Sequence, residues 1–185
     1  MTAIGTSPAR PGGNDGEPAV GHLTGTVWTT TMDSPIGQLS LTSDGSYLTG
    51  LYLEEQNYAP TERDAWVRNQ LPFVEVVAQI EAYFYGARRE FELPIKLEGT
   101  EFQMRVWNEL RAIPYGVTVS YGHLARQVGN PRACRAVGLA NGRNPIGIIV
   151  PCHRVIGVKG ALTGYGGGLD RKRWLLDHER SQLDG

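Results

Sequence analysis

The spacing of the apolar residues changes from a strand period to a helix period near Phe73. Before this point apolar and polar residues alternate in short runs, as at Leu39 and Leu41 and again at Leu51 and Leu53. Alternation with period 2 predicts strands that bury one face. From there on, apolar residues recur every three or four positions, which predicts a helix. The sequence therefore predicts an α+β fold that opens with a three-stranded antiparallel meander and one packed helix.

We expect four segments along the 185 residues. Residues 1–25 are rich in Gly, Pro, Thr and Ala without periodicity, which predicts a disordered tail. Residues 26–98 form the N-terminal domain of sheet and helix, in which the polar residues 54–72 connect the two. Residues 99–180 form a C-terminal domain, and residues 181–185 form a second tail.

Capping signals predict three helices in the C-terminal domain. Thr100 and Gln103 have capping-box spacing before the first helix, and Ser120 is placed to cap the second. The pair Gly129–Asn130 makes a tight turn, after which Asn130 would cap a third helix with Pro131 at its first position. Two short helices joined in this way predict a winged-helix-like helix-turn-helix.

The basic residues are unevenly distributed. The chain has a formal net charge of -1, yet no Asp or Glu occurs from Leu110 to Leu169. Such a basic stretch indicates a polyanionic partner, and the alternative is a set of solvated surface arginines. Sixty consecutive residues without a carboxylate favour the polyanion. The stretch contains Arg111, Arg126, Arg132, Arg135, Arg143, Arg154 and Lys159.

The third predicted helix, within PRACRAVGLANGRNP, is expected to face DNA. Arg132 and Arg135 are three residues apart and would share one face. Small residues such as Ala136 and Gly138 would let the helix approach a partner closely. Helix–helix packing is the alternative, but it would leave both arginines in need of buried partners. An arginine here suits phosphates or a gap in the base stack, whereas Cys134 is expected to face the interior and stay inert.

The cysteines and histidines indicate neither a disulfide framework nor a metal site. The chain has only Cys134 and Cys152, and its four histidines have no zinc-finger spacing. We therefore expect no metal and no cofactor. We also expect a cytoplasmic protein, because the sequence has neither a long apolar span nor a secretory signal.

Residues 146–157, IGIIVPCHRVIG, place a cysteine and a histidine after an apolar, strand-like run. Cys152 is either a buried thiol or a nucleophile. Neighbouring side chains of a strand point to opposite faces, but Pro151 would end the strand and let His153 reach Cys152 through a water. A histidine held by a carboxylate can activate a thiol whose pKa is ordinarily about 8.5. Acids available downstream are Asp170, Asp177 and Glu179.

The run IIVPCHRVIG, with RAVGLANGRNP before it and LTGYGGG and KRWLLDHE after it, resembles the O6-alkylguanine-DNA alkyltransferases. The resemblance is close from Phe102 to Glu179 and loose before it, and PCHR in this context is highly specific. It implies irreversible, stoichiometric transfer of an alkyl group from O6-alkylguanine in DNA to Cys152. O4-alkylthymine is an alternative substrate.

The resemblance also implies roles for further residues. His153 would be the water-linked base, oriented by Glu179, and Asn144 would brace the turn before the active-site strand. Tyr121 would assist rotation of the nucleotide and donate a proton to the leaving guanine. Arg135 would fill the gap in the base stack.

The base pocket implied by the resemblance contains Tyr165, Gly166, Lys172 and Val155. Double-stranded DNA would be approached from the minor groove, by a monomer without an obligate protein partner. A regulator that binds DNA without alkyl transfer is the main rival, and the presence of Cys152 counts against it. A cysteine hydrolase is a third reading, but the sequence has no oxyanion-hole signature.

Overall fold

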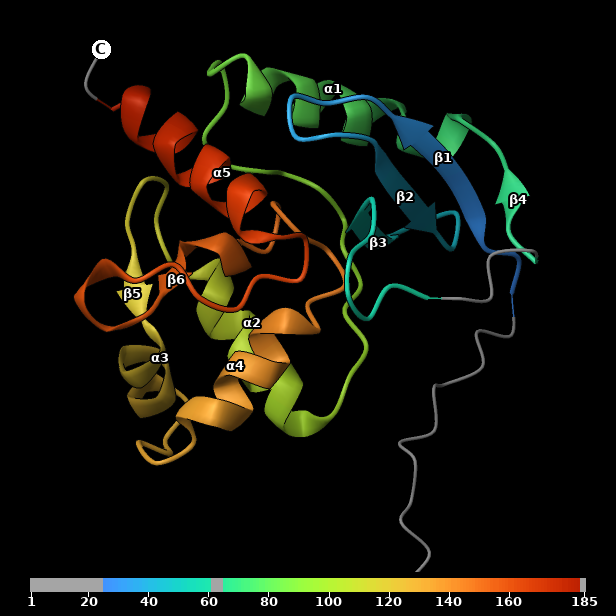
Figure 1. Cartoon of the computed structure of the whole chain (residues 1–185). Helices are drawn as coiled ribbons and strands as arrows, with labels where there is room; N and C mark the ends of the chain where they lie inside the picture. Colours follow the sequence, from blue (N-terminus) through green and yellow to red (C-terminus); the bar gives the residue numbers. More distant parts are fainter. Residues whose placement is uncertain (1–24, 61–64, 184–185) are drawn as a thin grey trace, which may run out of the picture.

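The computed structural model describes residues 25–60 and 65–183. Almost all of the predicted N-terminal tail, and residues 184–185 of the second tail, lie outside this part. Within it the N-terminal half, residues 25–98, is a sheet covered by a helix, and the C-terminal half, residues 99–183, is mainly helical (Figure 1). The α+β fold is confirmed.

The predicted meander is formed by β1 (Trp28–Met32), β2 (Leu39–Ser43) and β3 (Leu48–Leu53), which pair antiparallel in chain order. Gly37 and Gly45 make the two connections with φ of +102° and +101°. Glycine adopts positive φ without the steric cost of a Cβ atom. Local turn chemistry therefore sets the register that buries Leu41 and Leu51.

A fourth strand corrects the expectation for residues 54–72. β4 (Val67–Arg68) pairs parallel with β1, so in the described residues the sheet has the order β3-β2-β1-β4 and is mixed. Both residues of β4 are exposed. A two-residue strand without a buried face has no alternating pattern, so no sequence signal predicts it.

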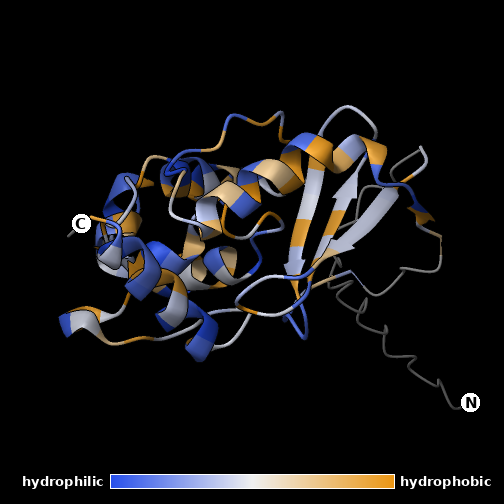
Figure 2. Cartoon of the chain, turned by 90° about the horizontal axis from the view of Figure 1, so that it is seen from above, coloured by the Kyte–Doolittle hydropathy of each residue, from blue (hydrophilic) through white to orange (hydrophobic). Residues whose placement is uncertain are grey.

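The helix predicted from Phe73 is present and covers one face of the sheet (Figure 1). The short 3-10 helix η1 (Leu71–Phe73) leads into α1 (Val74–Phe84), and Gly86 follows with a φ of +75°. Ile80 and Tyr83 are fully buried. Figure 2 shows apolar and polar residues alternating around the helices, as expected for elements with one face on a core.

The outer edge of β3 is bonded to the linker that follows α1 and, at Leu51, to the C-terminal half. The Leu48 N–H donates to the carbonyl of Pro94, and the Leu51 N–H donates to the carbonyl of Pro145, at 2.9 and 2.8 Å. Gly147 N–H donates back to Leu51 at 3.1 Å. The segment that leads to Cys152 is thus fixed on the sheet, and the edge is covered.

The helix-turn-helix is present in the C-terminal half. α2 (Glu101–Arg111) has the predicted Thr100–Gln103 capping box, and Ser120 caps α3 (Tyr121–Gln127). α4 (Cys134–Gly142) starts later than predicted, and Ala133 rather than Asn130 precedes it. The Ala133 N–H bonds to Asn130 at 3.0 Å, so residues 130–133 form a separate turn before the helix.

The strand expected before Cys152 is absent from the described residues. Ile148 has a φ of +67°, and the Val150 N–H bonds to the carbonyl of Ile146 at 3.0 Å, so residues 146–150 form a turn. The 3-10 helix η2 (Cys152–Arg154) follows directly. β6 (Val155–Ile156) then pairs parallel with β5 (Val119–Ser120), and the chain ends with η3 (Val158–Gly160) and α5 (Leu169–Ser181).

Candidate active site

Cys152 begins η2 and is 6% exposed. Its carbonyl accepts a hydrogen bond of 3.2 Å from the Asn141 amide. Burial raises the pKa of its thiol, although Asn144 and the charge of Lys172 act in the opposite direction. A thiol in this state needs a base before it can act as a nucleophile.

Asn144 closes the turn in front of Cys152. Its Oδ1 accepts from the Ile146 N–H at 3.1 Å, and its Nδ2 donates to the Val150 carbonyl at 2.7 Å. The side chain is buried, with 2% exposure. The amide therefore holds both ends of the turn and fixes the position of the cysteine.

His153 is fully buried against Glu179, with 2.8 Å between Nε2 and the Glu179 Oε1 atom. A carboxylate can only accept, so Nε2 carries the proton and Nδ1 has the free lone pair. Among the described residues Nδ1 has no hydrogen-bond partner. Burial lowers the pKa of His153 in spite of Glu179, so the ring is neutral near pH 7 and able to take a proton.

Glu179 is the centre of a buried hydrogen-bond network. Besides His153 it accepts from the Tyr83 hydroxyl, from the Gly116 N–H and, through both oxygens, from the Arg154 guanidinium. Burial alone would raise the pKa of Glu179, but the bonds from His153 and Arg154 outweigh it and hold the pKa well below its ordinary range. Glu179 is therefore a permanent anion.

This network corrects the interpretation of Arg154 as part of a basic surface. Arg154 is 7% exposed and pairs with Glu179, and its Nη1 donates to the Ile113 carbonyl at 2.6 Å. It is thus not a surface charge. Of the three acids proposed downstream, only Glu179 reaches His153, whereas the fully exposed Asp170 pairs with Arg173.

Tyr121 and Lys172 hold the loop that follows η2, residues 157–168. The Tyr121 hydroxyl lies 3.0 Å from the carbonyls of both Thr163 and Gly164. Lys172 Nζ donates to Val155 at 2.6 Å and to Thr163 at 2.9 Å. Burial lowers the pKa of Lys172 to about 8, while burial raises the pKa of Tyr121.

A narrow pocket of about 10 Å³ adjoins Cys152, large enough for about one water molecule. Of the four residues expected in the base pocket, Tyr165 and Gly166 line this pocket, whereas Lys172 and Val155 do not. Those two contact each other instead, since the Lys172 ammonium donates to the Val155 carbonyl. The Asn57 N–H donates to Gly166 at 3.0 Å, so the N-terminal half holds the loop against the pocket.

The exposed face of α4 differs in part from the prediction. Arg135 and Ala136 are exposed, but Arg132 lies in the turn before α4 and not on its face. Gly138 is half-buried beside the Tyr121 ring, 3.8 Å from an ideal Cβ position. The expectation that Cys134 faces the interior is wrong: it is exposed, because the buried face of α4 begins only at Val137.

Among the described residues no group of three or more His, Cys, Asp or Glu side chains could hold a metal ion. No helix in the same residues is long and apolar enough to cross a membrane.

Comparison with known families gives two matches that together span most of the chain. Residues 27–97 match the ribonuclease-like domain, and residues 101–181 match the DNA binding domain, of 6-O-methylguanine DNA methyltransferase. The chain belongs to the 6-O-methylguanine DNA methyltransferase family. The predicted family is thereby confirmed.

Similar members of this family come from distant organisms. A methylated-DNA--protein-cysteine methyltransferase of Mycobacterium leprae is 57% identical over 152 residues, which cover 82% of this chain and 92% of that protein. One of Methanosarcina acetivorans is 51% identical over 81% of this chain and 96% of that protein. The structure of Mycobacterium tuberculosis OGT in complex with DNA matches with a TM-score of 0.79 at 55% identity, covering 84% of this chain and 94% of that one.

For a 6-O-methylguanine DNA methyltransferase, sequence reasoning missed two residues of the site. The charge pattern predicts Arg154 only as part of a basic surface, although its place in the PCHR run, next to Cys152 and His153, is a signal for a residue of the site. Tyr83 belongs to none of the patterns found in the sequence, and its hydroxyl reaches Glu179 from 96 residues away in sequence. No local pattern could have linked the two.

Proposed function

We propose that the chain repairs DNA by moving an alkyl group from O6 of a damaged guanine to the sulfur of Cys152. The observation that carries this proposal is the position of Cys152 next to a neutral, buried His153 whose partner is the anion Glu179. The M. tuberculosis structure in complex with DNA supports DNA as the partner. O4-alkylthymine stays a second predicted substrate.

The base relay starts from the thiol. The Cys152 proton passes to His153 Nδ1 by way of a water molecule, and the imidazolium that forms is stabilised by Glu179. The thiolate attacks the alkyl carbon, the S–C bond forms and the C–O6 bond breaks. Asn144 supports the step by fixing the turn that carries Cys152.

The leaving guanine needs a proton, and Tyr121 is the proposed donor. Its hydroxyl bonds to the carbonyls of Thr163 and Gly164, so it must leave them to reach the base. Lys172, whose Nζ lies 5.8 Å from the centre of the Tyr121 ring, can then return a proton to the Tyr121 phenolate. The product is a thioether, whose C–S bond water does not hydrolyse, so each molecule reacts once without a cofactor.

The damaged base must leave the duplex before the reaction. We place α4 in the minor groove, where Ala136 and Gly138 allow close approach and Arg135 fills the gap in the stack. Arg132 in the preceding turn suits a phosphate contact. Because the pocket beside Cys152 holds about one water volume, loop 157–168 with Tyr165 and Gly166 must open to admit guanine. The protein would act as a monomer in the cytoplasm, at the nucleoid.

The direct test is a mass measurement. After incubation with duplex DNA that carries one O6-methylguanine, the peptide containing Cys152 should gain the mass of one methylene group. Cys152→Ala should bind the same DNA without transfer, and Cys134→Ala is the matched control, which should react normally. Transfer to another residue, or turnover beyond one lesion per molecule, would overturn the proposal.

The rival function is DNA binding without transfer. It predicts that Cys152→Ala and the unchanged protein behave alike in both assays. The neutral His153 base beside the thiol has no purpose under that reading.

A further inference from the structure

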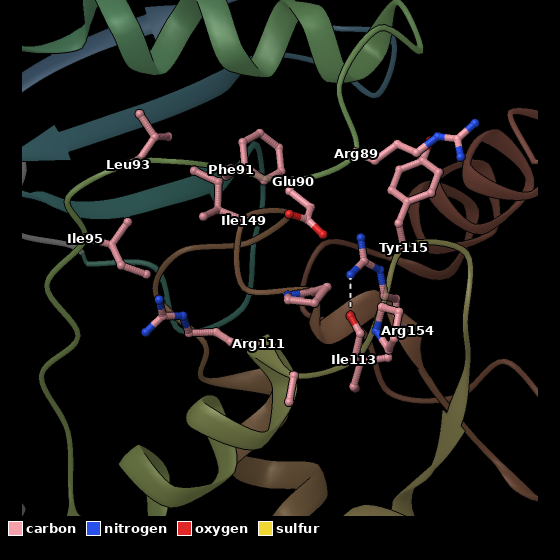
Figure 3. A pocket seen from close by; sticks show the side chains of 13 residues that line it. Arg89, Glu90, Phe91, Leu93, Ile95, Arg111, Ile113, Tyr115, Ile149 and Arg154 are labelled. Atoms are coloured by element: carbon pink, nitrogen blue, oxygen red, sulfur yellow. Dashed lines mark hydrogen bonds between the residues drawn. The ribbon is translucent and has the colours of Figure 1, made fainter.

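A second, larger pocket lies between the two halves of the molecule. Its volume is about 400 Å³, within the range of roughly 300–1,000 Å³ that is typical of small-molecule sites. Its walls come from the linker of residues 89–95, from the end of α2 with the turn after it, and from Ile149, Pro151 and Arg154 (Figure 3). Pro151 and Arg154 flank Cys152 and His153 in sequence, so the pocket adjoins the segment that carries the reactive cysteine.

One part of the pocket wall is apolar. Phe91, Leu93, Ile95 and Ile149 line it together, and Figure 3 shows their side chains grouped on the side of the linker. A flat hydrocarbon body placed there would remove apolar surface from water on both partners.

The polar part of the lining is mainly cationic. It contains the guanidinium groups of Arg89, Arg111 and Arg154 and the single carboxylate of Glu90. Glu179 neutralises Arg154, and Arg89 lies 5.8 Å from the Tyr115 ring centre and donates to the carbonyl of Gln182. Arg111 has no ion pair among the described residues. In Figure 3 it lies opposite Arg154, with Glu90 between them.

We propose that this pocket binds a small organic anion with a flat apolar body. The anionic group pairs with Arg111, and the body packs on Phe91 and Ile149. Such a ligand would lie against Pro151 and Arg154, behind the segment that carries Cys152. The binding site is independent of the proposed alkyl transfer.

The probe is 2-naphthoate, added to the full-length protein and followed by calorimetry and by amide shifts in NMR spectra. We expect one saturable site, with shifts at Arg111, Ile149 and Arg154. Arg111→Gln should weaken binding about tenfold or more, because a hydrogen bond to a charged group contributes about 1.5–3 kcal/mol. Glu90→Gln should tighten binding by removing a repelling charge. The neutral analogue 2-naphthamide should bind more weakly than the acid.

The matched control is Arg105→Gln, on the same helix α2 but outside the pocket lining, which should bind 2-naphthoate as the unchanged protein does. Arg111 is exposed, so its variant should fold, and circular dichroism checks this. The proposal is wrong if 2-naphthoate does not saturate at millimolar concentration, if Glu90→Gln weakens binding, or if the shifts fall on α4.

Discussion

The hydroxyl of Tyr83, on α1 of the N-terminal half, donates a hydrogen bond of 2.9 Å to Glu179 on α5. Both side chains are fully buried. The N-terminal half thus contacts the carboxylate that orients His153, which links the stability of the sheet half to the chemistry of the other half.

Tyr83→Phe should remove this bond and keep the ring. We expect a loss of about 1–2 kcal/mol in the free energy of unfolding, because a buried charged acceptor loses one donor. Urea unfolding measures the loss, and the rate of Cys152 alkylation should fall with it. Tyr85→Phe is the control: Tyr85 follows Tyr83 by two residues and is 85% exposed, so its variant should change neither the stability nor the rate. Equal stability of both variants would show that the bond is not significant.

The rate of alkylation should fall in acid. The pKa of His153 lies below its ordinary value of 6.5 because the ring is buried. The base is therefore neutral above this pKa, and the rate constant should rise with pH along a limb whose midpoint lies below pH 6.5. Single-turnover rates across pH measure the profile. His153→Gln should abolish the acid limb, whereas the exposed His123→Gln should retain it.

The free energy of unfolding should also fall in acid. His153 and Glu179 both have a folded-state pKa below the unfolded value, so the folded protein binds fewer protons than the unfolded chain. The stabilisation is complete above the unfolded values of 6.5 and 4.5 and is lost as pH falls through the folded values. Unfolding free energies that stayed constant from pH 7 to acid would contradict this sign.

Arg171 holds three segments together. Its guanidinium donates to the carbonyls of Ile36 and Glu54 at 2.8 Å and of Gly167 at 3.1 Å. Arg171→Gln should release the end of loop 157–168 from the N-terminal half, so we expect faster amide hydrogen exchange in this loop and slower alkylation. Arg173→Gln is the control, since within residues 25–60 and 65–183 the Arg173 guanidinium bonds to the exposed Asp170 and not to the loop. If the two variants exchange alike, Arg171 does not hold the loop.

Arg135→Ala should separate base extrusion from chemistry. Arg135 is exposed on α4, away from Cys152, and unstacking a base costs a few kcal/mol. Repair of duplex DNA should therefore slow by about tenfold or more, while reaction with the free modified base stays the same. Arg126→Ala, an exposed arginine on α3, is the comparison. Equal losses on both substrates would exclude a role in extrusion.

The sequence by itself determined the features that depend on neighbouring residues. The Thr100–Gln103 capping box and the Ser120 cap are made by groups three residues apart, and the glycine turns need only a local positive φ. The family was also readable from sequence, because the PCHR run and its flanks form one continuous pattern. All of these features can be recognised without knowing which distant residues are in contact.

The tertiary structure decided which groups meet across the chain. Three acids were available to His153, and only the packing of α5 against η2 selects Glu179. The turn before Cys152 replaces an apolar strand because Asn144 and the edge of β3 satisfy its backbone groups, which the apolar pattern alone does not reveal. Cys134 is exposed for the related reason that the true start of α4 sets which face is buried. Hydrogen bonds and burial depend on distances in space, and residues far apart in sequence leave no mutual signal in a single chain.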